Sequence, residues 1–145
     1  MVAAEQVRRL AAKGHEVTVV TSNIGKDDHY EKIDDYSVCR IRALNILEHL
    51  GIPYPIFAWN IFSILKDLLE KHDVIMVHGH SYIGSYVGAL LAKKFKKPLL
   101  VLQHNQFVEY PFPWGFIERI VDKTIGRYTL SQASMVLATS EVTRG

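Results

Sequence analysis

Two histidines follow a run of apolar residues in the stretch VIMVHGHSY, residues 74–82. His78 and His80 are two positions apart, so on a strand both side chains would lie on the same face. Imidazoles placed in this way could bind a metal ion, exchange hydrogen bonds with a polar substrate, or cap the strand by bonding to backbone groups. Gly79, between them, would allow a ligand to approach the backbone closely.

A catalytic metal site would need a third protein ligand. His104 ends a later apolar run and could supply it, so a metal-dependent hydrolase that uses His78, His80 and His104 is one interpretation. The nearest preceding carboxylate, Asp73, would lie at the opposite end of the strand. Because a His-x-His pair without a clear third ligand is a weak metal signal, we predict that no metal binds here.

Polar residues follow four of the apolar runs in the chain. These residues are Thr21-Ser22, His78–His80, His104-Asn105 and Thr139-Ser140. The beginnings of the runs carry ordinary boundary residues such as Asp73 and Pro98. In an open parallel sheet, ligands bind at the carboxyl ends of the strands. The asymmetry therefore favours a polar ligand at this edge. The candidate binding residues are His78, Gly79, His80, Asn105 and Ser140.

Structural interpretations of the same residues stay open. The three histidines His78, His80 and His104 could be half-buried strand caps that bond only to backbone. Ser140 precedes a glutamate and could be the N-cap of a helix, although a helix N-terminus also binds anions.

The spacing of apolar residues divides the chain into helices and strands. Helical spacing is found over residues 2–13, from about 57 to 68, 81–95 and 116–132. Continuous apolar runs predict strands at 15–22, 74–77, 99–103 and 134–140. Residues 36–44 alternate, with Cys39, Ile41 and Ala43 on one face, which is typical of a half-exposed edge strand. The polar stretch 23–35 is predicted to be a loop.

These elements follow the order α-β-β-α-β-α-β-α-β, and most of the strands are apolar on both faces. The pattern predicts an α/β, Rossmann-like domain over residues 1–145: a mostly parallel, doubly wound sheet with helices on both faces. Such domains usually begin with a strand whose following turn carries phosphate-contacting glycines. Because this chain begins with a helix, we expect it to be part of a longer protein and to lack that first strand.

Charge and composition argue against several classes of protein. The chain has 17 basic and 15 acidic side chains and a net charge of +2, which gives no electrostatic case for a nucleic-acid partner. Cys39 is the single cysteine and cannot form an internal disulfide, so a reducing, cytoplasmic setting is the simplest interpretation. The longest apolar stretch, residues 50–69, contains Pro53, Pro55 and Asn60 and is a poor transmembrane helix.

Residues 106–116 are unusually aromatic for a loop, and prolines at 111 and 113 stiffen them. The five rings are Phe107, Tyr110, Phe112, Trp114 and Phe116. They could fold back onto the core, face a substrate, or contact a membrane interface, where amphipathic rings are favoured. The nearby lysines between residues 93 and 97 would suit an anionic surface, or could form a solvated helix end.

Four segments together resemble family 4 glycosyltransferases, a retaining group with the GT-B fold. EQVRRLAAKGHEVTVVTS is similar to the first helix and second strand of that family. DVIMVHGH resembles its Asp-hydrophobic-His-x-His strand, and LLVLQHN resembles a later strand that ends in a histidine near the reaction centre. ASMVLATS resembles the strand that closes the acceptor-side core. The resemblance covers nearly the whole chain, in matching order and spacing.

The resemblance implies the N-terminal half of a GT-B fold. In that family a hexosyl group passes from a nucleotide-sugar donor to a lipid, glycan or small-molecule acceptor, usually without a metal or another cofactor. His104 matches the motif histidine that approaches the transferred sugar, so the resemblance makes it the catalytic candidate. His78 and His80 match the strand-end pair that lines the cleft.

The chain also departs from the family pattern. The first strand with its Gly-Gly loop and the donor-binding domain with its paired glutamates are absent from the sequence, and Asn105 stands where the family often has Asp or Gly. We therefore expect that these 145 residues do not transfer sugar alone. We expect a cytoplasmic protein that can contact the inner face of a membrane, and an exposed sheet edge that could support a homodimer. A non-catalytic Rossmann-like binding module stays an alternative.

Overall fold

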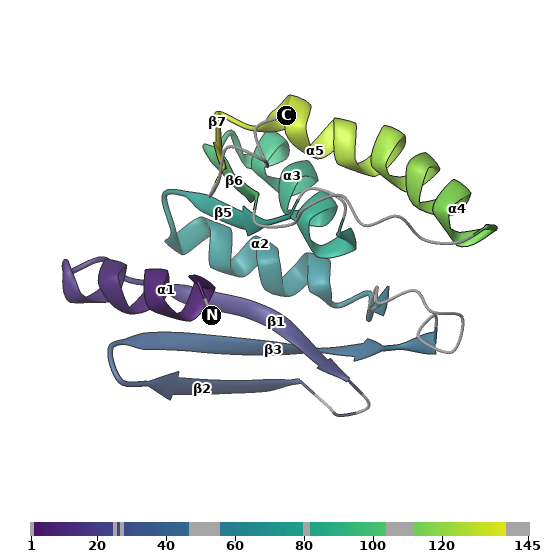
Figure 1. Ribbon diagram of the computed structural model, residues 1–145. Coiled ribbons are helices and arrows are strands. Elements are labelled where there is room, and N and C mark those ends of the chain that lie inside the picture. Colours follow the sequence, from purple (N-terminus) through teal and green to yellow (C-terminus); the bar gives the residue numbers. More distant parts are fainter. Residues whose placement is uncertain are drawn as a thin grey trace. The chain divides into compact units, whose positions relative to one another are not determined.

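The computed structural model describes residues 2–24, 26, 28–46, 56–79, 82–103 and 112–138. The chain divides into two compact units, Met1–Ile61 and Phe62–Gly145, here called unit 1 and unit 2. Unit 1 combines a sheet with one helix, and unit 2 combines a sheet with several helices (Figure 1). The protein is therefore mixed α/β, as the alternation of helical and extended patterns predicts.

Unit 1 consists of one helix and a four-stranded sheet, sheet A. Its elements are α1 (Val2–Ala12), β1 (Thr18–Ile24), β2 (His29–Ile33), β3 (Tyr36–Leu44) and β4 (Ile56–Phe57). β3 pairs with β1 in parallel and with β2 and β4 in antiparallel orientation. After α1 the chain turns at Gly14, whose φ of 90° suits glycine and explains why the helix stops there.

The core of unit 1 lies mainly on one face of β3, although Val38 on the other face is buried as well. Cys39, Ile41 and Ala43 are buried, and Ile41 has no exposed surface, whereas Arg40 and Arg42 on the other face are more exposed. This alternation confirms the period-two pattern of the sequence, because successive side chains of a strand point to opposite faces.

The position of β3 in the sheet contradicts the sequence-based prediction. Residues 23–35 do not form only a loop, because residues 29–33 are the strand β2, which shields the side of β3 that was expected to be an edge. The hairpin turns at Asp34-Asp35, and Asp34 has a φ of 49°. Aspartate tolerates this left-handed conformation better than most residues, so the two aspartates mark the turn.

Strand β1 begins and ends later in the sequence than predicted, at Thr18 and Ile24 in place of residues 15 and 22. The sequence indicated a strand end at Thr21-Ser22, but β1 continues to Ile24. Thr21 and Ser22 lie inside the strand, opposite Arg40 and Ile41 of β3. These two residues are therefore part of the β1–β3 ladder and not a polar strand terminus.

Unit 2 contains a parallel three-stranded sheet, sheet B, in the order β5-β6-β7. Its elements are α2 (Ile61–Lys71, beginning at the unit boundary), β5 (Ile75–His78), α3 (Ile83–Phe95), β6 (Leu99–Gln103), α4 (Trp114–Val121), the π-helical turn η2 (Asp122–Gly126), α5 (Arg127–Gln132) and β7 (Met135–Ala138). In Figure 1, α3 and α5 lie on one side of this sheet and α2 on the other. Parallel strands joined by helices confirm this part of the predicted architecture.

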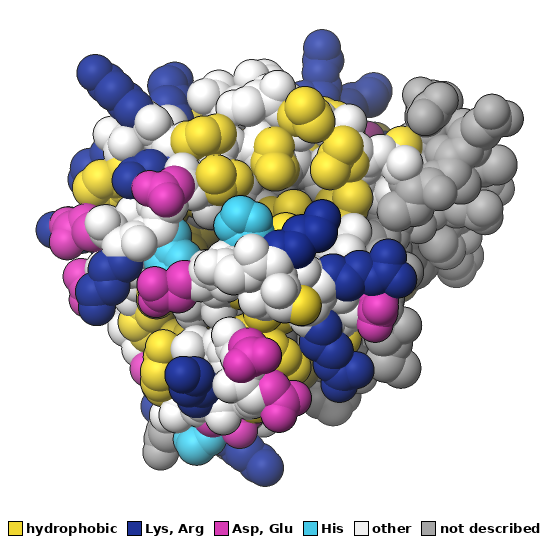
Figure 2. Space-filling model, turned by 90° about the vertical axis from the view of Figure 1, so that its left-hand side faces the viewer, with side chains coloured by type: hydrophobic (Ala, Val, Ile, Leu, Met, Phe, Trp, Pro, Cys, Tyr) yellow, Lys and Arg dark blue, Asp and Glu magenta, His cyan; other side chains and the backbone are white. Residues whose placement is uncertain are grey.

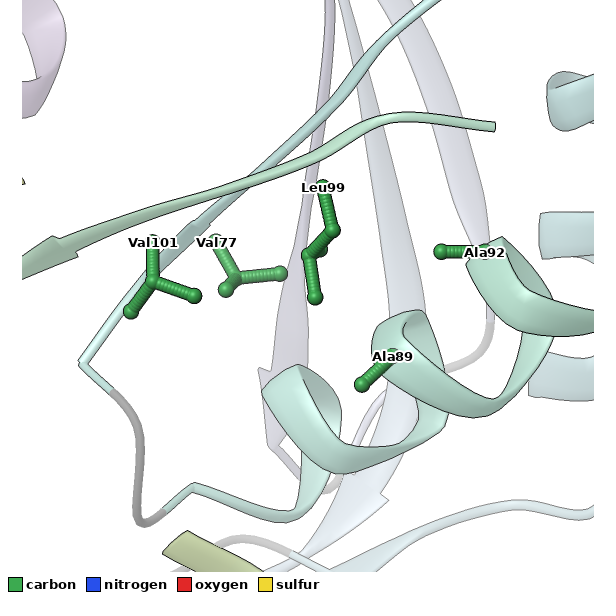
Figure 3. Packing of buried hydrophobic residues seen from close by; sticks show 5 residues of the cluster. All are labelled: Val77, Ala89, Ala92, Leu99 and Val101. Atoms are coloured by element: carbon green, nitrogen blue, oxygen red, sulfur yellow. The ribbon is translucent and has the colours of Figure 1, made fainter. Parts of the chain in front are cut away.

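The core of unit 2 joins the strands of sheet B to α3. Figure 3 shows Val77, Leu99 and Val101 beside Ala89 and Ala92 of the helix, and all five are buried. Small residues on α3 let the helix lie close to the sheet: a Cβ on Gly88 would be only 3.2 Å from Val77 Cγ1. Close helix–strand packing therefore fixes the position of β5 against α3.

The helix predicted over residues 116–132 is divided in the structure. The π-helical turn η2 separates α4 from α5, and within it the Thr124 hydroxyl donates to the Ile120 carbonyl at 2.7 Å. A threonine that bonds back to the preceding turn competes with the regular helical ladder. After the break, Tyr128 of α5 packs edge-on against Tyr86 of α3 with ring centroids 5.3 Å apart.

Candidate functional site

His78 is the last residue of β5 and stands at the carboxyl edge of sheet B. It is half-buried and pairs with Leu102 of the parallel strand β6. The next residue, Gly79, is buried, and its N–H donates to the Leu102 carbonyl at 2.9 Å. The pairing of the two strands thus extends one residue beyond β5 and holds the His78–Gly79 backbone in place.

Gly79 has a specific reason to be glycine. Its φ is 77°, a left-handed conformation that L side chains adopt at a cost. A Cβ built on it would also lie 2.7 Å from Tyr82 Cδ2 and closer still to Tyr82 Cε2. The ring of Tyr82 thus lies against Gly79 on the side where a Cβ would point, and the predicted approach of a ligand to this backbone stays a prediction. Sequence reasoning did not identify Tyr82, although a ring three residues after a strand-end glycine is a usable signal.

The carboxyl ends of the parallel strands lie in one row. His78 aligns with Leu102 in β6, and Gln103 at the end of β6 aligns with Ala138 at the end of β7. Gln103 is half-buried and is a polar side chain at this edge that the sequence-based set omitted. The described part of the edge therefore offers an imidazole, a backbone held by Gly79, a carboxamide and the Tyr82 ring.

Four of the predicted site residues lie outside the described residues: His80, His104, Asn105 and Ser140. His104 and Asn105 directly follow Gln103 in the sequence, and His80 directly follows Gly79. Their predicted roles stay predictions. Within the described residues, no group of three His, Cys, Asp or Glu side chains could hold a metal ion. Because the hydrolase interpretation needs His80 and His104, it stays untested as well.

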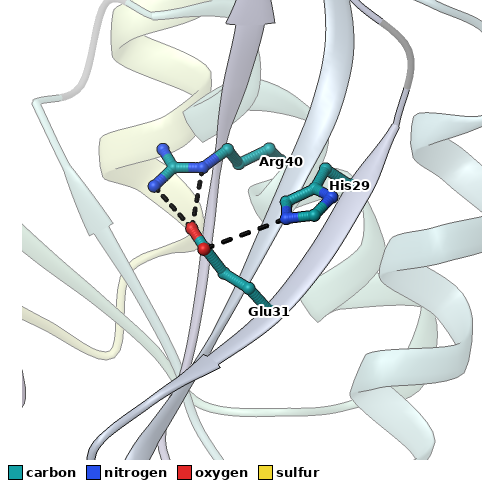
Figure 4. Close-up of polar contacts among 3 residues, drawn as sticks. All are labelled: His29, Glu31 and Arg40. Carbon is teal, nitrogen blue, oxygen red and sulfur yellow. Dashed lines mark hydrogen bonds and ion pairs between the residues drawn. The ribbon is translucent and has the colours of Figure 1, made fainter.

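Unit 1 contains a separate ionic cluster on the hairpin of β2 and β3. Arg40 Nη2 lies 2.7 Å and Arg40 Nε 3.0 Å from Glu31 Oε1, and His29 Nε2 lies 3.8 Å from Glu31 Oε2 (Figure 4). All three side chains are partly exposed and belong to neighbouring strands. Cross-strand pairing of β2 and β3 explains why these side chains meet, and the ion pairs stabilise the hairpin.

Cys39 is not a reactive thiol. The side chain is buried in the core of unit 1, and burial, followed by the nearby Asp28 carboxylate, raises the pKa of the thiol above its ordinary value. The thiolate is the nucleophilic form of cysteine, so a raised pKa lowers its reactivity at neutral pH. Cys39 is therefore a structural core residue.

Two rings of the aromatic segment do not fold back onto the core. Phe112 is 88% and Phe116 62% exposed, while Trp114 is half-buried. Phe107 and Tyr110 lie outside the described residues.

None of the described helices is both long and apolar enough to cross a membrane. On the face shown in Figure 2, acidic and basic side chains are interspersed, so that face carries no extended surface of one charge.

Comparison with known proteins gives one family assignment. The family described as Glycosyltransferase Family 4 matches residues 1–145, the whole chain. No curated protein matches the chain. The family match agrees with the motifs read from the sequence, and it includes both the described edge of sheet B and the segments that follow it.

Proposed function

Because the chain belongs to glycosyltransferase family 4, we propose that it is the acceptor-side, N-terminal domain of a retaining glycosyltransferase. The donor would be a nucleotide sugar and the transferred group a hexose. The acceptor would be a lipid, a glycan or a small molecule with a free hydroxyl. The proposal includes a cytoplasmic location, which the single, buried Cys39 supports.

One observation carries the proposal: β5 and β6 are parallel and in register, and their carboxyl ends bring His78, Gly79 and Gln103 to one edge. Ligands of parallel α/β sheets bind at this edge. His78 and Gln103 each offer a donor and an acceptor, which suits the hydroxyls of a sugar or polyol. His80, His104, Asn105 and Ser140 continue the same strand ends in sequence and complete the proposed binding set.

The proposed reaction exchanges one bond at the anomeric carbon for another. The bond to the diphosphate oxygen breaks, and its electron pair leaves with the nucleotide diphosphate. The acceptor oxygen forms the new bond on the same face, and its proton passes to the departing diphosphate. In this scheme a neutral His104 would bond a sugar hydroxyl and favour the positive charge that develops at the anomeric carbon.

The proposal includes the predicted doubly wound, GT-B type of sheet. A doubly wound, Rossmann-like sheet of the GT-B type needs more parallel strands than sheet B has. Among the described strands, β1 pairs only with β3 and β5 only with β6. Either strand could pair with a further parallel strand on its other edge, which is compatible with the larger parallel sheet of the proposed fold.

The test is binding of an acceptor by the 145-residue chain, followed by NMR. We would titrate maltose and, separately, a short-chain lipid phosphate into labelled protein. We expect one of them to shift the amide signals of Gly79 and Gln103 and the imidazole signals of His78. Shifts confined to other parts of the chain, or no shifts with either probe, would count against an acceptor site at this edge.

Matched histidine variants sharpen this test. His78→Ala should weaken probe binding by about tenfold, the value of one lost hydrogen bond to a polar ligand, and His78→Gln should restore part of it. His72→Ala is the control, because His72 is also half-buried in unit 2 but precedes β5 in the sequence and so lies away from its carboxyl end. Equal losses in both alanine variants would indicate a general loss of structure.

Two further measurements separate the alternatives. Incubation of the 145-residue chain with UDP-glucose and the bound acceptor should give no transfer product, because we infer that the donor binds mainly to the other domain of a GT-B fold. Product formation would contradict that expectation. Elemental analysis of the purified protein is the second measurement: stoichiometric zinc would support the metal-dependent hydrolase in place of the transferase.

A further inference from the structure

In the described part of unit 2, two polar side chains are buried, and their surroundings differ. Ser85 is 5% and Thr129 0% exposed. The Thr129 hydroxyl donates to the Ile125 carbonyl at 2.9 Å, whereas the Ser85 hydroxyl has no hydrogen-bond partner among the described residues. A buried hydroxyl without a partner lowers stability, so an exception of this kind indicates a partner that is not part of the chain.

Ser85 lies on the face of α3 that packs against β5, close to the carboxyl end of that strand. It precedes Gly88 by three positions, which places both residues on one face of the helix. A Cβ on Gly88 would lie 3.2 Å from Val77 Cγ1. Because α3 joins two parallel strands, it runs opposite to them, so its first turn lies beside the end of β5 at His78. Helical side chains tilt toward the N-terminus of their helix, which directs the Ser85 hydroxyl toward this edge.

The first turn of α3 has no side-chain cap. The residue at the N-cap position is Tyr82, which makes no capping bond with its side chain, and the first turn contains no acidic residue. The Tyr86 N–H donates to the Tyr82 carbonyl at 3.0 Å and is the first N–H with an acceptor inside the helix. The N–H groups of Ile83, Gly84 and Ser85 precede it and have no acceptor within the helix. Anions bind at helix N-termini of this kind.

Tyrosine is an unusual residue for the N-cap position. Serine, threonine, aspartate and asparagine are preferred there because a short side chain with an oxygen accepts from the first N–H groups. Tyr82 instead lies with its ring against Gly79. A local rule that the sequence breaks in this way is typical of a functional site. Among the described residues of this edge, which are His78, Gly79, Tyr82 and Gln103, none is acidic.

We propose that the first turn of α3 and the Ser85 hydroxyl bind the phosphate group of a phosphorylated acceptor. The N–H groups and the positive end of the helix dipole would hold the anionic oxygens, and the Ser85 hydroxyl would donate to one of them. His78 and Gln103 at the same edge would bind hydroxyls of the acceptor. The inference rests on the proposed acceptor role of this edge and adds the chemical class of the acceptor, a phosphate monoester of a sugar, a polyol or a lipid.

The set of donors favours a phosphate over a carboxylate. A phosphate monoester has three strong acceptor oxygens and carries close to two negative charges at neutral pH. A carboxylate has two oxygens and one charge. The successive N–H groups of the first turn, together with the Ser85 hydroxyl, offer more donors than a carboxylate has oxygens. A phosphate would therefore satisfy more of these groups.

The experiment compares ligands that differ only in the phosphate, by calorimetry and NMR on the 145-residue chain. Glucose 6-phosphate is paired with glucose, and dihexanoyl phosphatidic acid with dihexanoylglycerol. We expect at least one phosphorylated probe to bind about tenfold more tightly than its match, the value of a hydrogen bond to a charged group. It should shift the amide signals of Ile83, Gly84 and Ser85, and inorganic phosphate should shift the same signals. The pair that shows the difference distinguishes a sugar phosphate from a lipid phosphate.

The results separate this inference from the acceptor site itself. If glucose shifts Gly79 and Gln103 and the phosphate adds no affinity, the acceptor site stands and the phosphate inference is overturned. If inorganic phosphate shifts the first turn of α3 but no sugar or lipid probe binds, the phosphate site is supported and the proposed acceptor role is contradicted. The absence of any shift in α3 with all of these probes would overturn the inference.

Matched variants assign the binding to the Ser85 hydroxyl. Ser85→Ala should weaken binding of the phosphorylated probe about tenfold and leave binding of its phosphate-free match unchanged. The control is Thr129→Val, which also removes a buried hydroxyl from unit 2, but one that already has a partner, so both probes should bind as before. Without ligand, Ser85→Ala should melt at the same or a higher temperature than the native protein, because no bond is lost. A lower melting temperature with unchanged phosphate binding would show that the hydroxyl has only a structural role.

Variants of Tyr82 test the role of the helix N–H groups. Tyr82→Asp supplies a carboxylate at the N-cap, which should accept from the first N–H groups and abolish the preference for the phosphorylated probe while the helix stays formed. Tyr82→Ala removes the ring without supplying a cap and should keep the preference. Circular dichroism of both variants checks the fold. An equal preference in the two variants would show that the N–H groups do not hold the phosphate.

Discussion

Gly79 is subject to two separate constraints, one on its backbone conformation and one on the space around it. Its φ is positive and its missing Cβ would collide with the ring of Tyr82. Gly14 also has a positive φ, of 90°, but nothing lies within 4 Å of the place where its Cβ would be. The pair therefore separates the cost of backbone strain from the cost of a steric clash.

We predict that Gly14→Ala lowers the free energy of unfolding by about 1 kcal/mol, the strain of a left-handed alanine. Gly79→Ala should cost about 1–3 kcal/mol more, because the added methyl group overpacks the contact with Tyr82. Urea unfolding of each variant measures both values. In a Tyr82→Ala background the extra cost should disappear, and equal costs at Gly14 and Gly79 in the native background would contradict the clash.

Glu118 is a second residue whose environment has a measurable consequence. Because its pKa is raised from the ordinary value of 4.5, the folded protein binds the proton more tightly than the unfolded chain does. The ionised carboxylate therefore lowers stability at neutral pH. This deficit develops as the pH rises from the unfolded value through the raised folded value, and it is absent at lower pH.

We predict that Glu118→Gln stabilises the protein at pH 7, because it removes a charge that is disfavoured first by partial burial and then by Asp122. The gain should be about 0.2–0.5 kcal/mol, the usual size of a like-charge pair four residues apart on a helix. The gain should vanish at a pH below the ordinary carboxyl pKa, where Glu118 is protonated and resembles Gln. Thermal unfolding at both pH values tests this. A gain that is the same at both would assign the effect to helix propensity and not to charge.

At the scale of the element, helix α3 ends at a left-handed residue that is not the type best suited to this conformation. Lys96 has a φ of 54° and is the left-handed residue after the helix, and the Lys97 N–H donates to the Ala92 carbonyl at 2.9 Å. This is the geometry in which helices most often place glycine. Pro98 follows, as expected for a helix that cannot continue.

We predict that Lys96→Gly stabilises unit 2 by about 0.4–1 kcal/mol, because glycine removes the strain of the left-handed backbone. The control is Lys97→Gly, which removes the same type of side chain next to it but gains no such relief, so it should be neutral or destabilising. Denaturant midpoints of the two variants give the comparison. Destabilisation by Lys96→Gly as large as by Lys97→Gly would contradict the role of the left-handed residue.

At the scale of the whole molecule, each unit has a core of its own. Ile41 has no exposed surface in unit 1, and Leu99 has none in unit 2. We predict that Ile41→Ala and Leu99→Ala each cost about 2–5 kcal/mol, the range for a buried aliphatic side chain reduced to alanine. Native-state hydrogen exchange should show lost protection mainly in the unit that carries the substitution. Equal loss in both units would indicate one cooperative folding unit.

Much of the fold followed from local patterns in the sequence. The helix after Gly79, the apolar strands of sheet B and the alternation in β3 were all predicted from spacings of two to four residues. Such spacings are a direct consequence of the geometry of single helices and strands. The motifs around His78 and the order of the four segments also predicted the family that the comparison then identified.

Non-local pairing explains what the sequence did not reveal. The strand β2 was missed because its five residues, His29–Ile33, are mostly polar, and the neighbouring β3 stabilises them as a strand. The exposure of Phe116 depends in the same way on how distant segments pack, whereas the contact between Gly79 and Tyr82 is local and was missed because its backbone geometry is not a simple helical or strand period. A local period determines which residues share a face, but only the tertiary structure decides what that face meets.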